Sequence, residues 1–258
     1  MQEIIQNLQN EFGLTPVMAA EIECYVLLGE LTDERLDAFW KPIHDALREA
    51  SHPLLRIEKE RGDFQFELVT GITTPLQLEA TLRTMRAWVT EQAERMGVAA
   101  SFAAKPYAAQ PSSGLHLHVH LADDAGVNVF HKTEEWTSDA LRWSLGGMLA
   151  NLPTDLAVFF PDETDFIRLD DPDHVPKIAG WGVNNRSCAL RIPAIEDPYH
   201  KRIEHRVPCA NANPEAAISA LLAGVLRGLR EKIEPPEQVH GKASAGLRES
   251  LGTPTGGR

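Results

Sequence analysis

Glutamate, histidine and arginine side chains recur at every second position in short stretches of this sequence, with apolar residues between them. Successive residues of a β-strand point to opposite faces of a sheet, so each polar set lies on one face of its strand. If these strands share a sheet, one face collects most of the groups that could do chemistry. The polar sets are Glu21 and Glu23, Gln65 and Glu67, His116, His118 and His120, and Arg202, Glu204 and Arg206.

For a single strand, a solvated polar face is the simpler interpretation, but such faces usually mix Lys, Thr and Ser with their charges. Carboxylates that meet on one sheet face need cations to stay ionised. Their oxygens suit Mg²⁺ or Mn²⁺, and neighbouring arginines suit phosphate and carboxylate ligands. The pattern therefore indicates metal-assisted phosphoryl transfer. It does so without a Gly-x-x-x-x-Gly-Lys-Ser/Thr or Gly-x-Gly-x-x-Gly motif.

Composition narrows the classes of protein. The 258-residue chain is 43% hydrophobic with a net charge of −12, which fits one large domain or two small ones and disfavours a nucleic-acid partner. No apolar stretch reaches the length of a membrane span, and the polar N-terminus is unlike a signal peptide. Three cysteines without a Cys-x-x-Cys pair indicate buried reduced thiols. We expect a cytoplasmic protein with no membrane partner.

The sequence also predicts the helices and strands that must position the polar sets. Thr32 can cap a helix over 33–50, and Thr74 can open a second helix that stops at Gly97. The apolar run 214–231 predicts a third helix, largely buried. Period-two alternation predicts strands at 20–28, 64–69, 114–121, 188–193 and 202–207. The segment 234–258, rich in Pro, Gly and Ser, predicts a flexible tail that follows a single domain over 1–233.

Taken in chain order, five motifs resemble those of the glutamine synthetase catalytic domain. Each motif alone is weak, but their shared order from residue 21 to about residue 230 is specific. Phe64 stands where the family has glycine in its Gly-Gln-x-Glu motif. The motifs are Glu21-x-Glu23, Glu60 with Gln65-x-Glu67, Gly114-x-His116-x-His118, Asn185-Arg186-Ser187 with Arg191, and Arg202-x-Glu204-x-Arg206 followed by Asn213-Pro214.

The resemblance implies a fold and a set of metal ligands. The fold is α+β, with a curved, mostly antiparallel sheet that carries the active site on its concave face and helices packed outside. Two Mg²⁺ or Mn²⁺ ions are implied. The residues matched to the first ion are Glu23, Glu60 and Glu67, and those matched to the second are Glu21, His116 and Glu204.

The resemblance also implies roles for the basic residues. A clamp on the transferred phosphoryl group matches Arg186, Arg191 and Arg206, and ATP contacts match His118, Arg202 and Arg191. The acid substrate is matched by Arg168, which aligns with the arginine that holds the α-carboxylate, together with Arg206, Glu23 and Gly114.

Departures from the family pattern concern the amine half of the reaction. The chain starts almost at Glu21, so we expect the family's N-terminal domain, and the aspartate it lends to a neighbouring subunit, to be lacking. The family's ammonium-side glutamate is replaced by His174, next to Asp173, and the loop before Gly114 is altered. We also expect most of the family's C-terminal helical region to be lacking. We therefore expect an organic amine as acceptor, with His174 as a candidate catalytic base, and at most a small homo-oligomer.

The sequence thus predicts an ATP-dependent carboxylate–amine ligase. ATP would phosphorylate a carboxylate, expected to be the γ-carboxylate of glutamate, and an amine would displace phosphate. One alternative is a catalytically silent protein of the same fold that binds nucleotide or amino acid. The other is a Zn²⁺ metallohydrolase built on the three alternating histidines, which the excess of carboxylates disfavours.

Overall fold

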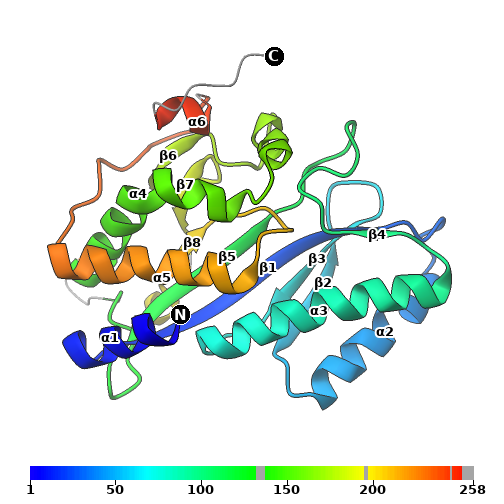
Figure 1. Ribbon diagram of the computed structural model, residues 1–258, viewed down its shortest axis with the longest axis horizontal. Helices are drawn as coiled ribbons and strands as arrows, with labels where there is room; N and C mark the ends of the chain where they lie inside the picture. Colours follow the sequence, from blue (N-terminus) through cyan, green and yellow to red (C-terminus); the bar gives the residue numbers. More distant parts are fainter. Residues whose placement is uncertain (132–136, 195–196, 245, 252–258) are drawn as a thin grey trace.

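One sheet organises the molecule, and the helices pack on it (Figure 1). The computed structural model describes residues 1–131, 137–194, 197–244 and 246–251. The sheet is eight-stranded in the order β2-β3-β1-β5-β8-β7-β6, with β4 paired to β1. The strands are β1 (Thr15–Val26), β2 (Leu54–Lys59), β3 (Gln65–Thr70), β4 (Ala100–Ser101), β5 (Leu115–Ala122), β6 (Ile178–Val183), β7 (Cys188–Ile192) and β8 (Ile203–His205).

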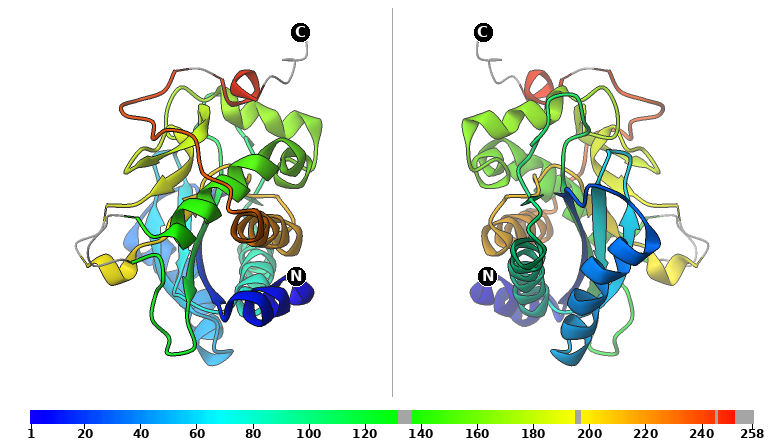
Figure 2. Two further views of the ribbon diagram at one scale, coloured as in Figure 1. Left: turned by 90° about the vertical axis from the view of Figure 1, so that its left-hand side faces the viewer. Right: turned by 90° about the vertical axis from the view of Figure 1, so that its right-hand side faces the viewer.

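All neighbouring strands are antiparallel except β6 and β7, which run parallel. The helices lie mainly on one face of the sheet (Figure 2). The α+β class with a mostly antiparallel sheet is therefore confirmed. The helices are α1 (Gln2–Phe12), α2 (Asp33–Glu49), α3 (Pro75–Met96), α4 (Asp139–Phe159), α5 (Pro214–Glu231) and α6 (Leu247–Ser250), with 3₁₀ turns at Glu163–Asp170 and Pro198–His200.

Local signals explain the helix ends. The Thr32 hydroxyl accepts a hydrogen bond from the backbone N–H of Arg35, and Thr74 does the same for Gln77, each at 3.3 Å. Gly97 ends α3 in the left-handed conformation, with φ of 64°. These are ordinary N-caps and a glycine C-cap, so the predicted helices that follow Thr32 and Thr74 are confirmed.

The alternation along the strands separates core from site. Ile22 and Cys24 of β1 and Leu117 of β5 are fully buried beneath the helices. The polar residues between them face the other way, as the period of two requires. The core beneath the sheet therefore holds β1 and β5 rigid while their polar faces stay available for ligands.

Helix α4 was not predicted, nor were α1, β2, β4 and β6. Helix α4 contains Gly146, Gly147 and Pro153, which lower its intrinsic helix propensity. The glycines instead allow close packing, because a Cβ at Gly147 would lie 2.1 Å from the carbonyl oxygen of Gly224 in α5. Tertiary contact overrides local propensity at this crossing.

The segment after Ile233, expected to be a flexible tail, contacts the body in its described part. Glu234 pairs with Arg142 of α4 at 3.0 Å. The indole N–H of Trp181 donates to the Pro236 carbonyl at 2.7 Å, and the Val239 N–H donates to the Trp181 carbonyl at 2.9 Å. The domain boundary at residue 233 stays a prediction. Among the described residues, no helix is both long and apolar enough to cross a membrane.

Candidate active site

Strand register brings the predicted carboxylates together. Glu23 of β1 lies opposite Glu67 of β3, and Glu21 lies opposite His116 of β5. Residues directly opposite in an antiparallel pair have their Cβ atoms about 5 Å apart. Two strand pairings therefore place four of the six predicted metal ligands in one patch on one face of the sheet.

The pairing of β8 with β5 and with β7 brings Glu204 to the same patch. Glu204 of β8 lies opposite His118 of β5 on one side and opposite Arg191 of β7 on the other. The Glu204 side chain is fully buried. A carboxylate at that depth needs charged partners, and the neighbouring strands supply them.

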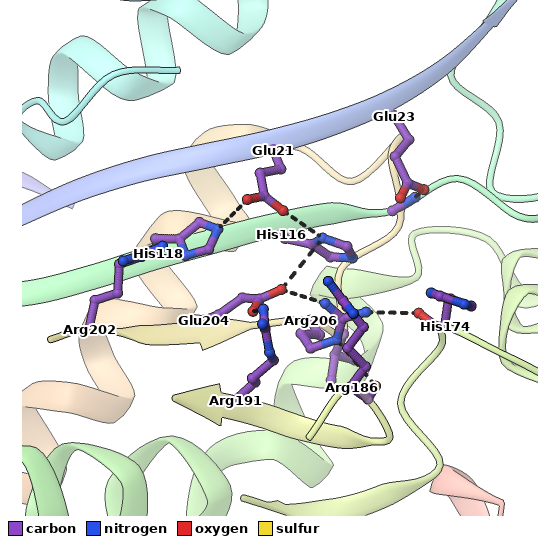
Figure 3. Close-up of polar contacts among 12 residues, drawn as sticks. Glu21, Glu23, His116, His118, His174, Arg186, Arg191, Arg202, Glu204 and Arg206 are labelled. Atoms are coloured by element: carbon purple, nitrogen blue, oxygen red, sulfur yellow. Dashed lines mark hydrogen bonds and ion pairs between the residues drawn. The ribbon is translucent and has the colours of Figure 1, made fainter. Parts of the chain in front are cut away.

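Glu21, His116 and Glu204 form the first of two candidate metal clusters. The Nδ1 atom of His116 lies 3.3 Å from a Glu21 oxygen and 3.7 Å from a Glu204 oxygen (Figure 3). One ligand atom from each of the three residues falls within 4.8 Å of the others. The set matches the second ion of the sequence prediction in every member.

Glu23, Glu67 and His116 form the second cluster. His116 is shared by both clusters, although the sequence assigned it to one ion. The predicted Glu60 is outside this cluster, but it lines the same cavity as Glu23, Glu67 and His116. The charge of Glu60 helps to raise the pKa of Glu23 and of Glu67. The Nε2 atom of His116 is buried without a hydrogen-bond partner.

Electrostatics show that the second cluster suits a cation. Burial, together with repulsion from Glu21 and Glu23, raises the pKa of Glu67 to about 9. Burial raises the pKa of Glu23 to about 7, although Arg168 opposes it. Crowded carboxylates that cannot all ionise by themselves are the donor set that hard divalent cations prefer. With the partnerless His116 nitrogen, these residues fit Mg²⁺ or Mn²⁺.

The first cluster differs from the second because Arg191 and Arg206 already neutralise the charge of its Glu204 carboxylate. Burial would raise the pKa of Glu204, but Arg206 and the two histidines hold it at about 2. Burial and Arg206 lower the pKa of His116 to about 4. The imidazole is therefore neutral near pH 7 and has a lone pair free for a metal. Neither cluster among the described residues contains a second histidine, which argues against the zinc alternative.

Arginine side chains surround Glu204. An Arg191 Nη donates to Glu204 at 2.5 Å and Arg206 forms a second ion pair with it. Arg206 also donates to the His174 carbonyl at 2.9 Å and to the Arg186 carbonyl at 3.3 Å. Arg206 therefore connects the metal ligands of the sheet to two loops. Arg186 itself is exposed and lines the cavity.

The predicted acid-binding residues lie beneath the same cavity. Arg168 is 1% exposed and donates to the carbonyls of Arg206 and Val207, each at 3.1 Å. A Cβ at Gly114 would lie 2.5 Å from the Arg168 guanidinium, so glycine leaves room there. The Gly114 N–H donates to Glu23 at 2.6 Å. Arg168 lines the cavity, and its Nε has no partner.

Two of the predicted nucleotide residues, His118 and Arg202, do not line this cavity, whereas the third, Arg191, does. Arg202 donates to Nδ1 of His118 at 3.2 Å, and Nε2 of His118 lies 3.2 Å from Glu21. Both residues line a separate, mostly apolar cavity of about 230 Å³, which also includes Leu55 and Ile72. Glu21 lines both cavities, so it marks their junction.

The central cavity has a volume of about 340 Å³ and unites most of the predicted site. Its lining contains all six predicted metal ligands, with Arg168, Arg186, Arg191, Arg206 and His174. Of the predicted site residues, His118, Arg202 and Gly114 do not line it. This cavity holds donors for divalent cations beside arginines suited to a phosphoryl group.

Comparison with known proteins agrees with this geometry. Residues 28–252 match the family described as glutamine synthetase, catalytic domain. The chain belongs to the glutamine synthetase catalytic-domain family. Glu21 and Glu23 precede the matched residues. Their assignment to the metal clusters therefore rests on the register of β1 with β3 and β5.

Curated relatives extend the likeness. The gamma-glutamylputrescine synthetase PuuA of Escherichia coli strain K12 is 33% identical over 258 residues, covering 89% of this chain and 54% of that protein. A glutamine synthetase of Pyrococcus furiosus is 36% identical over 179 residues, covering 69% of this chain and 40% of that protein. The chain spans about half the length of the curated relatives it matches.

Solved structures share the fold. The structure titled as a complex of GmaS with ADP has a TM-score of 0.82 at 22% identity, covering 92% of this chain and 60% of that one. GmaS without ligand has a TM-score of 0.80 at the same identity, covering 92% and 59%.

Phe64 reveals why the family motif has glycine at this position. Its φ is 60°, in the left-handed region that a bulky side chain rarely adopts. Its carbonyl accepts a hydrogen bond from the Val26 N–H at 2.9 Å, which ties the turn to β1. His174 has a φ of 64° beside the cavity. Strained backbone of this kind gathers at functional sites.

Sequence reasoning missed several residues around the cavity. Glu58 of β2 lies opposite Glu67 and lines the cavity, as do Arg56 and Arg61. Asp171 accepts a hydrogen bond from the Ser112 N–H at 2.6 Å and pairs with the partly buried Lys105. Glu58 alternates with Arg56, so the period-two signal was present, whereas Asp171 and Lys105 lie on loops with no such signal.

Proposed function

We propose that this chain is the catalytic domain of an ATP-dependent ligase that joins the γ-carboxylate of glutamate, or of a related acid, to an organic amine. The observation that carries the proposal is the pair of metal clusters that share His116, next to two arginines bound to Glu204. A divalent cation, a phosphoryl group and an acceptor carboxylate are the ligands that this donor set fits.

The first step would transfer the γ-phosphoryl group of ATP to the substrate carboxylate, giving an acyl phosphate and ADP. Glu23 and Glu67 would hold one cation, and Glu21 and Glu204 the other, with His116 between them. Bound divalent ions would neutralise the charge that builds on the phosphoryl oxygens. Arg191 and Arg206 stand against Glu204, so their remaining N–H groups are preorganised to bind the phosphoryl group and the carboxylate that receives it.

The nucleotide would occupy the apolar cavity at Glu21. Leu55 and Ile72 of its lining would contact a planar base, and His118 and Arg202 would contact the phosphates. Glu21 borders both cavities. The γ-phosphoryl group would then point into the central cavity, toward the arginines.

In the second step the amine nitrogen would attack the acyl phosphate carbonyl, form the amide bond and expel inorganic phosphate. The nitrogen must lose a proton, and His174, which lines both the central cavity and a neighbouring one, would accept it. Burial and the charge of Arg61 lower the pKa of His174, so the imidazole is neutral near pH 7. The relative PuuA is named for a putrescine product, which supports an organic amine over ammonium.

The test is direct. Purified protein would be incubated with ATP, Mg²⁺ and glutamate, with ammonium or a panel of primary amines, and ADP and amide would be quantified. We expect ADP release that depends on the amine, and a γ-glutamyl amide by mass spectrometry. Nucleotide binding without ADP release for any acid or amine would instead support the silent binding protein. Efficient glutamine formation with no gain from any amine would reject the organic acceptor.

A further inference from the structure

A second cavity of about 430 Å³ adjoins the central one. The two share Asp173, His174, Val175 and Arg186, so a ligand in the second cavity would reach the phosphoryl site past His174. We call it the acceptor cavity. Its lining consists of Pro172, Asp173, His174, Val175, Lys177, Val183, Asn184, Asn185, Arg186, Ser187, Gly241 and Lys242.

The C-terminal segment builds one wall of the acceptor cavity. The side-chain amide of Asn185 donates to the carbonyls of Val239 at 3.2 Å and Gly241 at 2.7 Å. The Ala243 N–H donates to the hydroxyl of Ser187 at 2.8 Å. These bonds fasten the segment to the loop between β6 and β7. Lys242 is therefore held at the edge of the cavity by its own backbone neighbours.

The charges of this lining are unequal. Lys177, Arg186 and Lys242 are cationic, and Asp173 is the one carboxylate among the lining residues. Lys242 pairs with Asp173, and its hydrogen bond lowers the pKa of that carboxyl. Asp173 is thus ionised and already neutralised. The imidazole of His174 adds no positive charge near pH 7, because its pKa is lowered as well.

We propose that the acceptor cavity selects amines whose far end is anionic or neutral and polar, and discriminates against amines that carry a second cation there. The proposal rests on the ligase function proposed above and specifies its acceptor class, which would differ from the diamine for which PuuA is named. A second ammonium would meet three cationic side chains and a carboxylate that Lys242 already occupies. Repulsion of this kind is an established route to specificity. A carboxylate or hydroxyl at the same place would instead find the N–H groups that Lys177 and Lys242 retain beside their bonds to the Leu169 carbonyl and to Asp173.

A series of acceptors with one chain length isolates this effect. The probes are 4-aminobutanoate, 4-aminobutan-1-ol and 1,4-diaminobutane, each tested with ATP, Mg²⁺ and glutamate. We expect kcat/KM for amide formation to fall in that order, with roughly a tenfold difference between the anionic and the dicationic acceptor, as for charges near a protein surface. Lys242→Glu should reverse the order, while the KM for glutamate stays unchanged.

The control is Lys41→Glu, because Lys41 forms a similarly exposed pair with Asp45 on α2, far from the cavity. This variant should keep the wild-type order of acceptors. Amide formation with the diamine preferred, or an order that Lys242→Glu leaves unchanged, overturns the inference and leaves the ligase function standing. Failure to form an acyl phosphate or amide with every acceptor, ammonium included, rejects both.

Discussion

The two halves of the proposed reaction site are built in different ways. The phosphoryl half lies on strands, where β1, β3, β5 and β8 hold the carboxylates and His116 in register. The acceptor half lies on loops, where His174 and Asn184 adopt positive φ values of 64° and 49°. Arg206 joins the two halves, since it pairs with Glu204 and bonds the His174 carbonyl.

This difference between strands and loops indicates which part of the site can tolerate substitutions. A strand residue cannot move to the other face without a shift of the whole register, so the metal chemistry is tied to the fold. A loop residue depends on a few fastening bonds, such as those of Asn185 with the C-terminal segment. Specificity for the acceptor can therefore vary while the phosphoryl step is kept.

The largest effect is expected at Glu204, on the strand side. Glu204→Gln removes a ligand from the first cluster and leaves Arg191 and Arg206 without their buried carboxylate. Turnover should fall by about 10³-fold or more, and stability by about 3 kcal/mol, as for a broken buried ion pair. Activity, Mn²⁺ binding by electron paramagnetic resonance and thermal melting measure this. Glu231→Gln, an exposed change on α5, is the control, and equal Mn²⁺ affinity in both variants would refute the metal assignment.

A smaller effect is expected at Arg191, which lies 14% exposed at the cavity. Arg191→Ala should cut turnover by about 10² to 10³-fold, because a donor to the transferred phosphoryl group is lost. Arg206 still pairs with Glu204, so the melting temperature should change by only a few degrees. Arg191→Lys should restore little, since lysine lacks the bidentate fork. A fully active alanine variant would exclude Arg191 from the phosphoryl step.

On the loop side, His174→Ala should separate the two steps. Amide formation should fall by about 10²-fold, the usual contribution of a general base. Acyl phosphate formation, trapped with hydroxylamine, should stay near the wild-type rate, because His174 does not bind the phosphoryl group in this scheme. Equal losses in both assays would show that the division into halves is wrong. His44→Ala, an exposed histidine on α2 outside the cavities described above, serves as the comparison.

Asp171 tests how the loop of Ser112 is fastened. Asp171→Asn weakens the bond to the Ser112 N–H and breaks the ion pair with Lys105. The KM for the acid substrate should rise by roughly tenfold, about the loss of one charged hydrogen bond, while the KM for ATP changes little. Steady-state kinetics with each substrate varied in turn measure the split. A rise in both KM values would point to general loosening instead.

The smallest effect is expected at Phe64. Phe64→Ala and Phe64→Gly both remove the ring, but only glycine relieves the positive φ. The glycine variant should be more stable than the alanine variant by about 1 kcal/mol. Urea unfolding of the two variants measures the difference. A more stable alanine variant would mean that the turn relaxes to another conformation.

Strand-borne parts of the molecule were the predictable ones. The spacing of Glu21 and Glu23 and of His116 and His118 predicted faces, and the structure puts these faces in one sheet. What the sequence lacked was register, so it could not show that His116 serves both clusters or that Glu60 stands outside them. These facts depend on which residues lie opposite one another, and a single strand does not encode its partner.

The unpredicted parts follow tertiary contacts. Helix α4 forms despite Gly147, because α5 approaches its backbone there. The wall of the acceptor cavity comes from a Pro- and Gly-rich segment whose composition predicts little burial, yet Leu247 is 1% exposed. The backbone carbonyls of Val239 and Gly241 accept hydrogen bonds from Asn185. A pattern of side chains in the sequence does not predict contacts of this kind.

The place of β8 has a consequence for how the protein folds during synthesis. Although β8 is the last strand among the described residues, it lies between β5 and β7 and joins two parts of the sheet. A nascent chain that ends before Ile203 can pair β1 with β3 and β5, and β6 with β7, but cannot connect the two groups. Such non-local pairings form slowly, and Glu204 arrives only with this closing strand. The first cluster should therefore be completed late, when the ribosome has released the chain beyond β8, whereas the second cluster needs only β1, β3 and β5.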